Sequence, residues 1–322
     1  MLGELRRAPE TGDAALARVT GADHLDRGEL VRAVIARNPG ITAMREAWRA
    51  ALADVGAAGA IADPMVTYEL APLSIASNVP FGQRVQVSQK LPFPGKRGRA
   101  GDAAVADAEI ARADLRAATL AVAELASNLY DDYALAEQEL VVNDHHQMAA
   151  AQMKKAVEAQ LAAGRGSTQD ALAADVELAK MVEERVPIDA ERAEIVARLD
   201  GLLHRDPEAA LPPPRDLQVA PAEPPPLAAL LKLAAERPDA FAAGERIAAG
   251  QAKVELAERA FDPDFEIMGS YDSMWAMTAH RWMLGIGIEV PLQRARRNAE
   301  VDAARARVAQ ASAELERVRD DV

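Results

Sequence analysis

An internal repeat is the feature that most limits how this chain can fold. The chain has 322 residues, and three of its prolines recur at a single offset of 199 residues: Pro39, Pro64 and Pro92 match Pro238, Pro263 and Pro291. The flanking residues agree as well, for example SQKLPF with GIEVPL. Self-similarity at a fixed offset is typical of a fold built from copies of one unit. The chain is therefore expected to contain two copies.

The residue pattern predicts the same order of elements in each copy: a helix, two strands and a long helix. The first copy is expected at 27–204, with strands at 64–77 and 81–92 and long helices at 96–163 and 168–204. The second is expected at 227–322, with strands at 263–275 and 280–291. Residues 1–26 are expected to form an N-terminal segment without order. The eight prolines within 205–226 predict an extended, semi-rigid linker between the copies.

The longest predicted helix, at 96–163, contains no proline, and its apolar residues step by three and four. Such spacing is typical of a coiled-coil seam. The sequence AAGRGSTQDAL then turns the chain, with Gly164 ending one helix and Ser167 or Thr168 starting the next. A long helical hairpin is the expected result.

The four predicted strands alternate between apolar and polar residues. In the second strand Val85 and Val87 share a face, and in the fourth Trp282, Leu284, Ile286 and Ile288 do so. Alternation over about ten residues fits a membrane β-barrel, and it also fits a solvent-exposed sheet packed on helices. Four strands cannot close a barrel, whereas three chains would supply twelve. The flanking helices are also too long and thin to cover a sheet face.

Composition excludes several classes of protein. The net charge of −13 argues against nucleic-acid binding, and the absence of cysteine excludes disulfides, thiolate metal sites and thiol nucleophiles. No run of 18 apolar residues could span a bilayer as a helix, and no secretory signal is visible at the N-terminus. His145 and Met148 stand three apart on a helix, which more often indicates a solvated face than a metal site. We expect no enzyme, cofactor or metal site.

The stretch LPFPGKRGRA at 91–100 separates the β pattern from the helical pattern. It is not a phosphate-binding loop, because Lys90 and Arg97 occupy positions where that motif needs glycine and Ser or Thr. It is expected to be a strand-to-helix junction, because proline cannot donate to a strand ladder. Lys96, Arg97 and Arg99 have counterparts at Arg294, Arg296 and Arg297, which suggests a cationic collar at a membrane boundary. The junction residues are Pro92, Pro94, Gly95, Lys96, Arg97 and Pro291.

These patterns resemble the TolC-type outer-membrane efflux proteins over residues 27–322. The resembling stretches include ARNPGITAMREAWRAALADVGAAGAIADP, VSQKLPFPGKRGRA, AAGRGSTQDALAADVELA and GIGIEVPL. The form QKLPFPGKRG is most similar to the branch that serves heavy-metal efflux pumps.

The resemblance implies a mainly α fold with β strands, in which two tandem repeats form a trimeric membrane β-barrel continued by a periplasmic α-helical barrel. It implies a passive exit duct for metal ions or small toxic compounds. The partners would be two further copies, a periplasmic adaptor protein, an inner-membrane proton-driven pump and outer-membrane lipid. Adaptor contact would fall on the hairpin tip, at Gly164, Arg165, Gly166 and Ser167. The lipid-facing residues would be Val85, Val87, Trp282, Leu284, Ile286 and Ile288.

The chain departs from the family pattern in two ways. The second copy is shorter than the first by about 80 residues after its last matched proline, and no export signal is visible. We therefore expect an incomplete second repeat, without the hairpin that carries the gate in the family. A soluble coiled-coil scaffold with no transport role remains the alternative.

Overall fold

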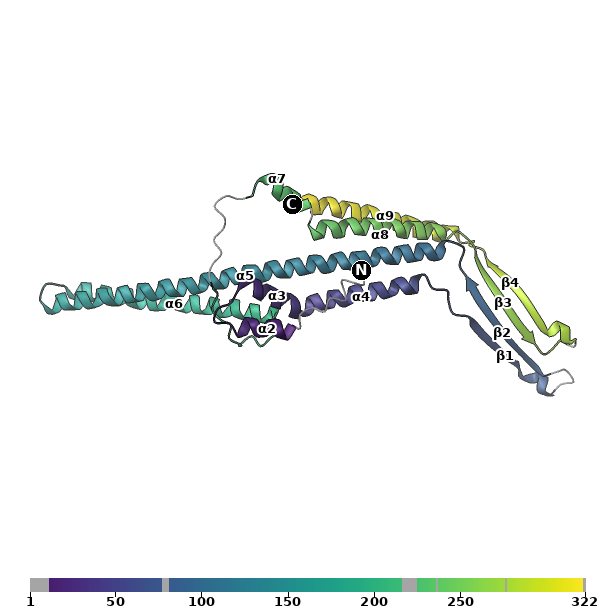
Figure 1. Ribbon diagram of the computed structural model, residues 1–322, viewed down its shortest axis with the longest axis horizontal. Coiled ribbons are helices and arrows are strands. Elements are labelled where there is room, and N and C mark those ends of the chain that lie inside the picture. The colour runs from purple at the N-terminus through teal and green to yellow at the C-terminus, as the bar shows by residue number, and fades with distance from the viewer. Residues whose placement is uncertain (1–11, 77–80, 216–224, 236, 276, 321–322) are drawn as a thin grey trace. The chain divides into compact units, whose positions relative to one another are not determined.

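The computed structural model describes residues 12–76, 81–215, 225–235, 237–275 and 277–320. The chain divides into two compact units (Figure 1). Unit 1 comprises Met1–Ala43 and Ala118–Pro224, and unit 2 comprises Met44–Ala117 and Pro225–Val322. Helix and strand elements alternate in the order that the repeat predicts: α2 (Gly12–Thr20), α3 (Arg27–Arg37), α4 (Pro39–Ala58), β1 (Met65–Ala71), η1 (Pro72–Ala76), β2 (Gly82–Leu91), α5 (Lys96–Ala162), α6 (Thr168–Leu202), α7 (Leu227–Ala235), α8 (Pro238–Arg259), β3 (Asp264–Asp272), η2 (Thr278–Arg281), β4 (Trp282–Glu289) and α9 (Arg294–Asp320).

The core of unit 1 lies where α2 and α3 pack against parts of α5 and α6. Leu30 and Val34 of α3 are fully buried, together with Tyr133 of α5 and Leu199 of α6. These residues recur every three or four positions on their helices, so each helix buries one stripe. The hydrophobic stripes therefore hold the base of the α5–α6 hairpin to the N-terminal helices.

Residues 12–26 are ordered, which corrects the expectation of an unstructured segment at 1–26 for this part of it. Ala15 and Val19 of α2 are buried, and Leu25 is fully buried. The backbone N–H of Leu25 donates to the carbonyl of Pro213 at 2.8 Å. Apolar burial and backbone pairing thus order this segment. Residues 1–11 lie outside the described residues.

The first half of the expected linker is docked on unit 1 and does not form a free crossing. Leu211 is 7% exposed, and Leu25 and Pro214 form a parallel β-bridge. The hydroxyl of Tyr130 donates to the carbonyl of Leu25 at 3.1 Å and accepts from the N–H of Arg215 at 3.2 Å. The prolines leave carbonyls free as acceptors, so the segment can pair without being a regular strand. Residues 216–224 of the linker lie outside the described residues.

Unit 2 contains a four-stranded antiparallel sheet in the order β1-β2-β3-β4. The central pair joins the two repeats, with Val85 opposite Tyr271 and Val87 opposite Gly269. The strands are shorter than expected from the sequence at 64–77 and 263–275. Strand β1 ends where the chain enters the short helix η1, whereas β3 ends at Asp272 in a turn and η2 directly precedes β4.

Helices of the two repeats also meet within unit 2. The N-terminal part of α5 is tied to α8 by ion pairs from Asp107 Oδ1 to Lys253 Nζ and from Asp114 Oδ1 to Arg246 Nη2, both at 2.6 Å. Helices α8 and α9 pack side by side (Figure 1). At Gly250 of α8 the packing is so close that an added Cβ would lie 2.8 Å from Val308 Cγ2 of α9. Small residues therefore set the spacing of the helices.

Local signals place the helix boundaries. Asn38 ends α3, and its side-chain oxygen accepts from the N–H of Gly40 at 2.9 Å at the start of α4. Helix α4 begins at Pro39, as proline in a first turn predicts. At ~1.5 Å per residue, the 67 residues of α5 make a helix on the order of 100 Å long. The bounds of α5 and α6 lie within two residues of the expected hairpin helices.

Candidate functional site

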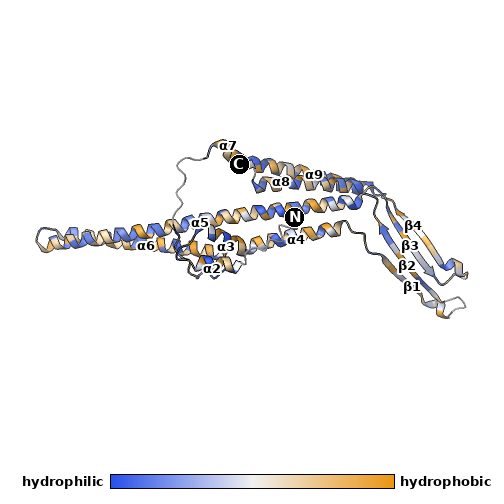
Figure 2. Cartoon of the chain, in the orientation of Figure 1, coloured by the Kyte–Doolittle hydropathy of each residue, from blue (hydrophilic) through white to orange (hydrophobic). Residues whose placement is uncertain are grey.

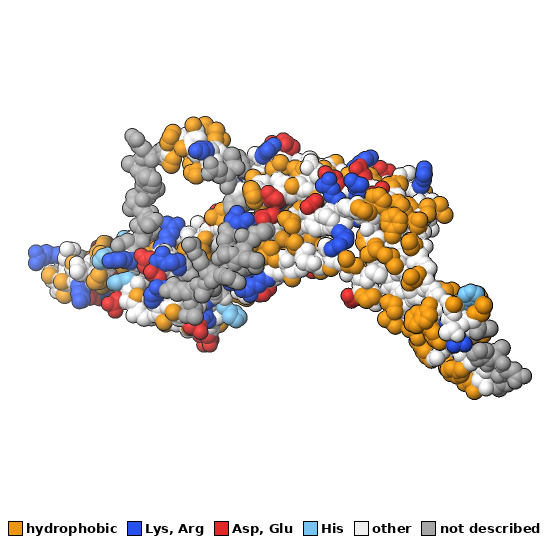
Figure 3. All heavy atoms as spheres, turned by 45° about the vertical axis from the view of Figure 1, so that its right-hand side comes forward, with side chains coloured by type: hydrophobic (Ala, Val, Ile, Leu, Met, Phe, Trp, Pro, Cys, Tyr) orange, Lys and Arg blue, Asp and Glu red, His pale blue; other side chains and the backbone are white. Residues whose placement is uncertain are grey.

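The sheet has one face that is almost entirely apolar, here called the apolar face. The pairing register places the outward residues of all four strands in rows on this face. Exposure is high: Leu284 is 93% exposed, Ile286 77% and Trp282 72%. Figure 2 shows hydrophobic residues recurring along the strands, and Figure 3 shows hydrophobic side chains gathered over the sheet. The six residues expected to face lipid all lie on the apolar face: Val85, Val87, Trp282, Leu284, Ile286 and Ile288.

The opposite face, here called the polar face, carries ion pairs. Arg84 Nη2 lies 2.8 Å from Asp272 Oδ2, and Arg84 Nη1 lies 3.2 Å from Glu69 Oε2, so one guanidinium joins three strands. Nearer the helices, Lys90 Nζ lies 3.8 Å from Glu289 Oε2. A sheet with one apolar and one charged face can separate an apolar medium from water. Sequence reasoning missed this network because it connects strands that are remote in the chain.

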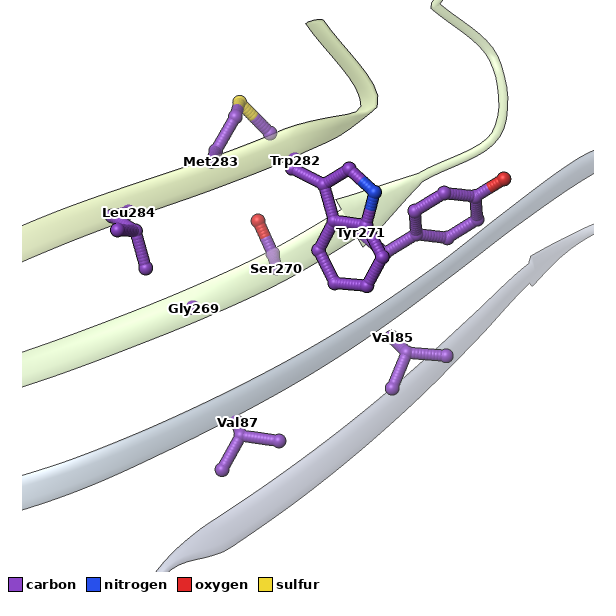
Figure 4. A pocket seen from close by; sticks show the side chains of 8 residues that line it. All are labelled: Val85, Val87, Gly269, Ser270, Tyr271, Trp282, Met283 and Leu284. Carbon is purple, nitrogen blue, oxygen red and sulfur yellow. The ribbon is translucent and has the colours of Figure 1, made fainter. Parts of the chain in front are cut away.

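A shallow hollow of about 840 Å³ lies along the apolar face (Figure 4). Tyr271 and Trp282 close one end of it, with ring centroids 5.1 Å apart, and Val85 and Val87 line its side. Gly269 forms part of the floor, and the nearest side-chain atom to an added Cβ there would be Leu284 Cδ2 at 3.6 Å. Its lining residues are mostly apolar and include no carboxylate, lysine, arginine or histidine, so the hollow suits hydrocarbon rather than a reacting polar substrate.

Aromatic pairs stand at both ends of the sheet. At the end near the helices, the rings of Phe93 and Phe265 stack with centroids 6.3 Å apart. At the other end are Tyr271 with Trp282, and Trp275 with His280 at 5.9 Å. Phe265 and Tyr271 are six residues apart on β3, which corresponds to about 20 Å along a strand. This spacing approaches the height of the apolar band between the aromatic girdles of membrane β-barrels, about 25 Å.

The structure places the predicted junction residues between strand and helix. Strand β2 ends at Leu91 and α5 begins at Lys96, while Pro291 lies between β4 and α9. Gly95 has a φ of 94°, a conformation that residues with a Cβ rarely adopt. The Lys96 ammonium lies 2.8 Å from Asp264 Oδ1 and donates to the carbonyl of Asp262 at 2.8 Å. Lys96 therefore ties the first junction to the start of β3.

Two arginines of the expected cationic collar cap helix ends instead. Arg97 Nε donates to the carbonyl of Gly59 at the end of α4, and Arg297 Nε donates to the carbonyl of Ala260 at the end of α8, both at 2.8 Å. The last carbonyls of a helix lack intrahelical partners, and a cation there also complements the helix dipole. Arg294 and Arg296 are exposed. The predicted cationic collar is therefore not made of free cations alone, because Arg97 and Arg297 each bind a helix end. The two arginines form the same contact in the two repeats.

The hairpin tip is a tight turn between α5 and α6. Gly164 has a φ of 68°, and its N–H donates to the carbonyl of Leu161 at 2.9 Å. The Ser167 hydroxyl accepts from the N–H of Asp170 at 3.1 Å, which completes a capping box. Arg165 is exposed and Gly166 half-buried. The structure thus presents the four expected adaptor-contacting residues together at one end of the hairpin.

The described residues place no group of three or more His, Cys, Asp or Glu side chains to hold a metal ion. Met148 is 54% exposed on α5, and His145 is also exposed. Of the helices in the described ranges, none has both the length and the apolar content needed to cross a membrane.

Comparison with known proteins identifies the fold. No protein-family model and no curated protein matches the chain. Solved structures do match: a membrane protein from Pseudomonas aeruginosa has 21% identity and a TM-score of 0.72, covering 92% of this chain and 74% of that one. CusC, described in terms of transmembrane channel formation, has 18% identity and a TM-score of 0.74 over 92% and 72%. The outer-membrane protein VceC of Vibrio cholerae has 17% identity and a TM-score of 0.73 over 98% and 79%.

The chain is thus mainly helical with a small antiparallel sheet, and it has the fold of TolC-type outer-membrane efflux channels. The resemblance expected from the sequence is confirmed at the level of fold.

Proposed function

We propose that this chain is the outer-membrane channel subunit of a tripartite efflux pump. Three copies would join their sheets into one twelve-stranded β-barrel in the outer membrane, and their helices would form a duct through the periplasm. The observation that carries this proposal is the two-faced sheet. Its apolar face would contact lipid, and its ion-paired polar face would line a water-filled lumen.

The free energy of burial supports this placement of the sheet. Apolar surface removed from water contributes roughly 25 cal/mol per Å², so a face with Leu284 at 93% and Ile286 at 77% exposure is costly to leave in water. Strands of nine and eight residues in β3 and β4 approach the length that crosses a bilayer. The aromatic pairs at both ends lie where barrel proteins carry interfacial girdles.

The sheet edges support assembly from several copies. Among the described strands, β1 pairs only with β2 and β4 only with β3, so each has an unpaired edge. In hydrocarbon each unsatisfied backbone group costs several kcal/mol, so an open sheet is excluded and the edges must close on other strands. Three copies close such a barrel without any other protein.

The remaining parts of the proposal rest on the shared fold. The duct is passive and carries out no covalent chemistry. Its partners are a periplasmic adaptor, which would meet the hairpin tip at 164–167, and an inner-membrane proton-driven pump. The substrates are metal ions or small toxic compounds, as the resemblance of QKLPFPGKRG to the heavy-metal branch implies.

The test is the behaviour of the purified chain in detergent. We expect a trimer that partitions into detergent and resists cold SDS, because every strand edge is then hydrogen-bonded. The measurement is the mass of the protein–detergent particle by light scattering, with gel mobility with and without heating. A monomer that stays in solution without detergent would favour the coiled-coil scaffold and rule out the channel.

A further inference from the structure

The two repeats of one chain are in contact with each other, and this internal contact shows how the second repeat packs against the first. Strand β2 pairs with β3, and α5 is held to α8 by the ion pair between Asp107 and Lys253 at 2.6 Å. At the base of the strands, Phe93 stacks on Phe265, and Lys96 donates to the carbonyl of Asp262 at 2.8 Å. Each of these contacts joins the trailing strand and helix of one repeat to the leading helix and strand of the next.

The free sides of unit 2 present the same kinds of element. Strands β1 and β4 form the two edges of the sheet, with α4 leading into β1 and α9 following β4. Elements α4 and β1 correspond to α8 and β3, while β4 and α9 correspond to β2 and α5. The β4–α9 side of one chain therefore has the elements needed to pack against the α4–β1 side of a second copy, in the way that β2 and α5 pack against α8 and β3 within one chain.

Structural equivalences fix which residues correspond. Arg97 and Arg297 cap the preceding helices in the same way, which aligns α5 with α9 at an offset of 200 residues. Pro39 and Pro238 begin α4 and α8, which aligns those helices at an offset of 199. Under this alignment Asp107 corresponds to Arg307.

The same alignment places Asp54 at the position of Lys253. Both charges of the internal ion pair are thus reversed at the free sides, so the attraction between the two positions is kept. Asp54 and Arg307 are both exposed. Within the described ranges, neither side chain forms an ion pair or hydrogen bond. The other internal ion pair, between Asp114 and Arg246, is not repeated in this way, because the same alignment places it at Glu314 and Ala47.

A second set of equivalent positions lies where the strands join the helices. Phe93 and Phe265 correspond to Leu292 and Val66, which are 82% and 67% exposed. These two apolar side chains occupy the positions of a stacked pair but are uncovered in a single chain. Lys96 corresponds to Arg296, whose side chain is 73% exposed, and Asp262 corresponds to Asp63, which is exposed. Charge and apolar complementarity are therefore present at two levels of the same surface.

We propose that α9 and β4 of one chain dock onto α4 and β1 of a second copy, with Arg307 forming an ion pair with Asp54 of that copy. Arg296 would meet Asp63 of the second copy in the same interface. This proposal rests on the trimer of the proposed function, and it specifies the surface and the charge pair that close the ring.

Disulfide cross-linking tests the surface directly, because the chain contains no cysteine. In the variant with Asp54→Cys and Arg307→Cys, mild oxidation of the detergent-solubilised protein should give covalent dimers and trimers that reduction removes. The control combines Asp54→Cys with Asp302→Cys. Asp302 is also exposed on α9, but it lies five residues earlier and about 140° around the helix from Arg307. This pair of cysteines should therefore give no covalent dimers or trimers.

The outcomes separate this proposal from the proposed function. The interface would be overturned, and the proposed channel function kept, if the protein is trimeric in detergent but the Asp54→Cys, Arg307→Cys variant gives no covalent dimers or trimers. The same conclusion would follow if the control with Asp302→Cys gives an equal amount of them. A wild-type protein that is monomeric would overturn both.

Charge reversal supplies a second measurement that needs no cross-link. Asp54→Arg places two cations together and should reduce the trimer fraction, whereas Asp54→Arg combined with Arg307→Asp should restore it. Loss of trimer in both variants, or in neither, would contradict the ion pair.

Discussion

At the scale of single residues, a buried carboxylate on α6 lies beside a cation. Asp200 of α6 is fully buried, and its Oδ1 lies 2.7 Å from Nε of Arg205. Burial raises the pKa of Asp200 to about 6, the nearby Asp206 carboxylate adds to the rise, and the Arg205 cation opposes it. A buried carboxylate is costly when ionised, even beside a cation.

We predict that Asp200 makes the protein less stable as pH rises from about 4 to about 6. The folded state holds the Asp200 proton more tightly than the unfolded state, whose ordinary pKa is 3.8, so ionisation favours unfolding across that window. The loss should reach at most about 3 kcal/mol and level off above the folded pKa. Denaturant unfolding followed by circular dichroism at several pH values measures it.

Asp200→Asn is the control for this prediction, because an amide does not titrate and the slope across the window should flatten. A stability that rises across the window and keeps that slope in Asp200→Asn would show that the carboxyl's pKa is not raised.

At the scale of elements, helix contacts in unit 2 depend on how closely two backbones approach. Gly250 and Gly244 both lie within α8, but their surroundings differ. A Cβ at Gly250 would meet Val308 at 2.8 Å, whereas a Cβ at Gly244 would meet nothing within 4 Å. Two glycines on one helix therefore provide a matched comparison between intrinsic propensity and packing.

We predict opposite effects for alanine at the two glycines. Gly244→Ala should stabilise the protein by up to about 1 kcal/mol, because glycine is a poor helix former and the site has room. Gly250→Ala should destabilise it by about 1–3 kcal/mol, because the overpacked site forces α8 and α9 apart. Thermal unfolding of both variants provides the comparison. Adding Val308→Ala to Gly250→Ala should recover part of the loss; no recovery would mean that α9 is not the constraint.

At the scale of the whole molecule, the two faces of the sheet should respond differently to charge. Ile286 is 77% exposed on the apolar face, and Met283 of the same strand lies on the polar face and is 39% exposed. An isolated soluble sheet would tolerate arginine at either position, whereas a barrel in lipid would tolerate it only on the lumen side.

We predict that Ile286→Arg abolishes insertion into membranes and that Met283→Arg does not. Arginine at the middle of a bilayer costs a lipid-facing strand about 2–4 kcal/mol per chain, and each trimer contains three chains. The measurement is the fraction of each variant recovered as heat-modifiable trimer in the membrane pellet. Equal recovery of the two variants would argue against a lipid-facing role for the apolar face.

Much of the architecture is already visible in the sequence, because it depends on short-range periodicity. The matched prolines, the two-residue alternation near Val87 and Ile286 and the three- and four-residue steps of α5 are local patterns, so element order and the apolar face could be predicted from them. The strand lengths could not be predicted, because β1 gives way to the short helix η1 and β3 gives way to a turn.

Only the tertiary structure decided how distant residues pair. Arg84 bonds to Asp272 188 positions away, Arg97 and Arg297 cap helices of their own repeats, and the linker docks on Leu25. The sequence does not distinguish these pairings from solvated side chains, because the residues around a charged side chain are of the same kind whether it faces water or a partner. The sequence alone determined the repeat, the strand faces and the long hairpin; the fold determined which charges are satisfied within the chain and which, like Asp54 and Arg307, are left exposed.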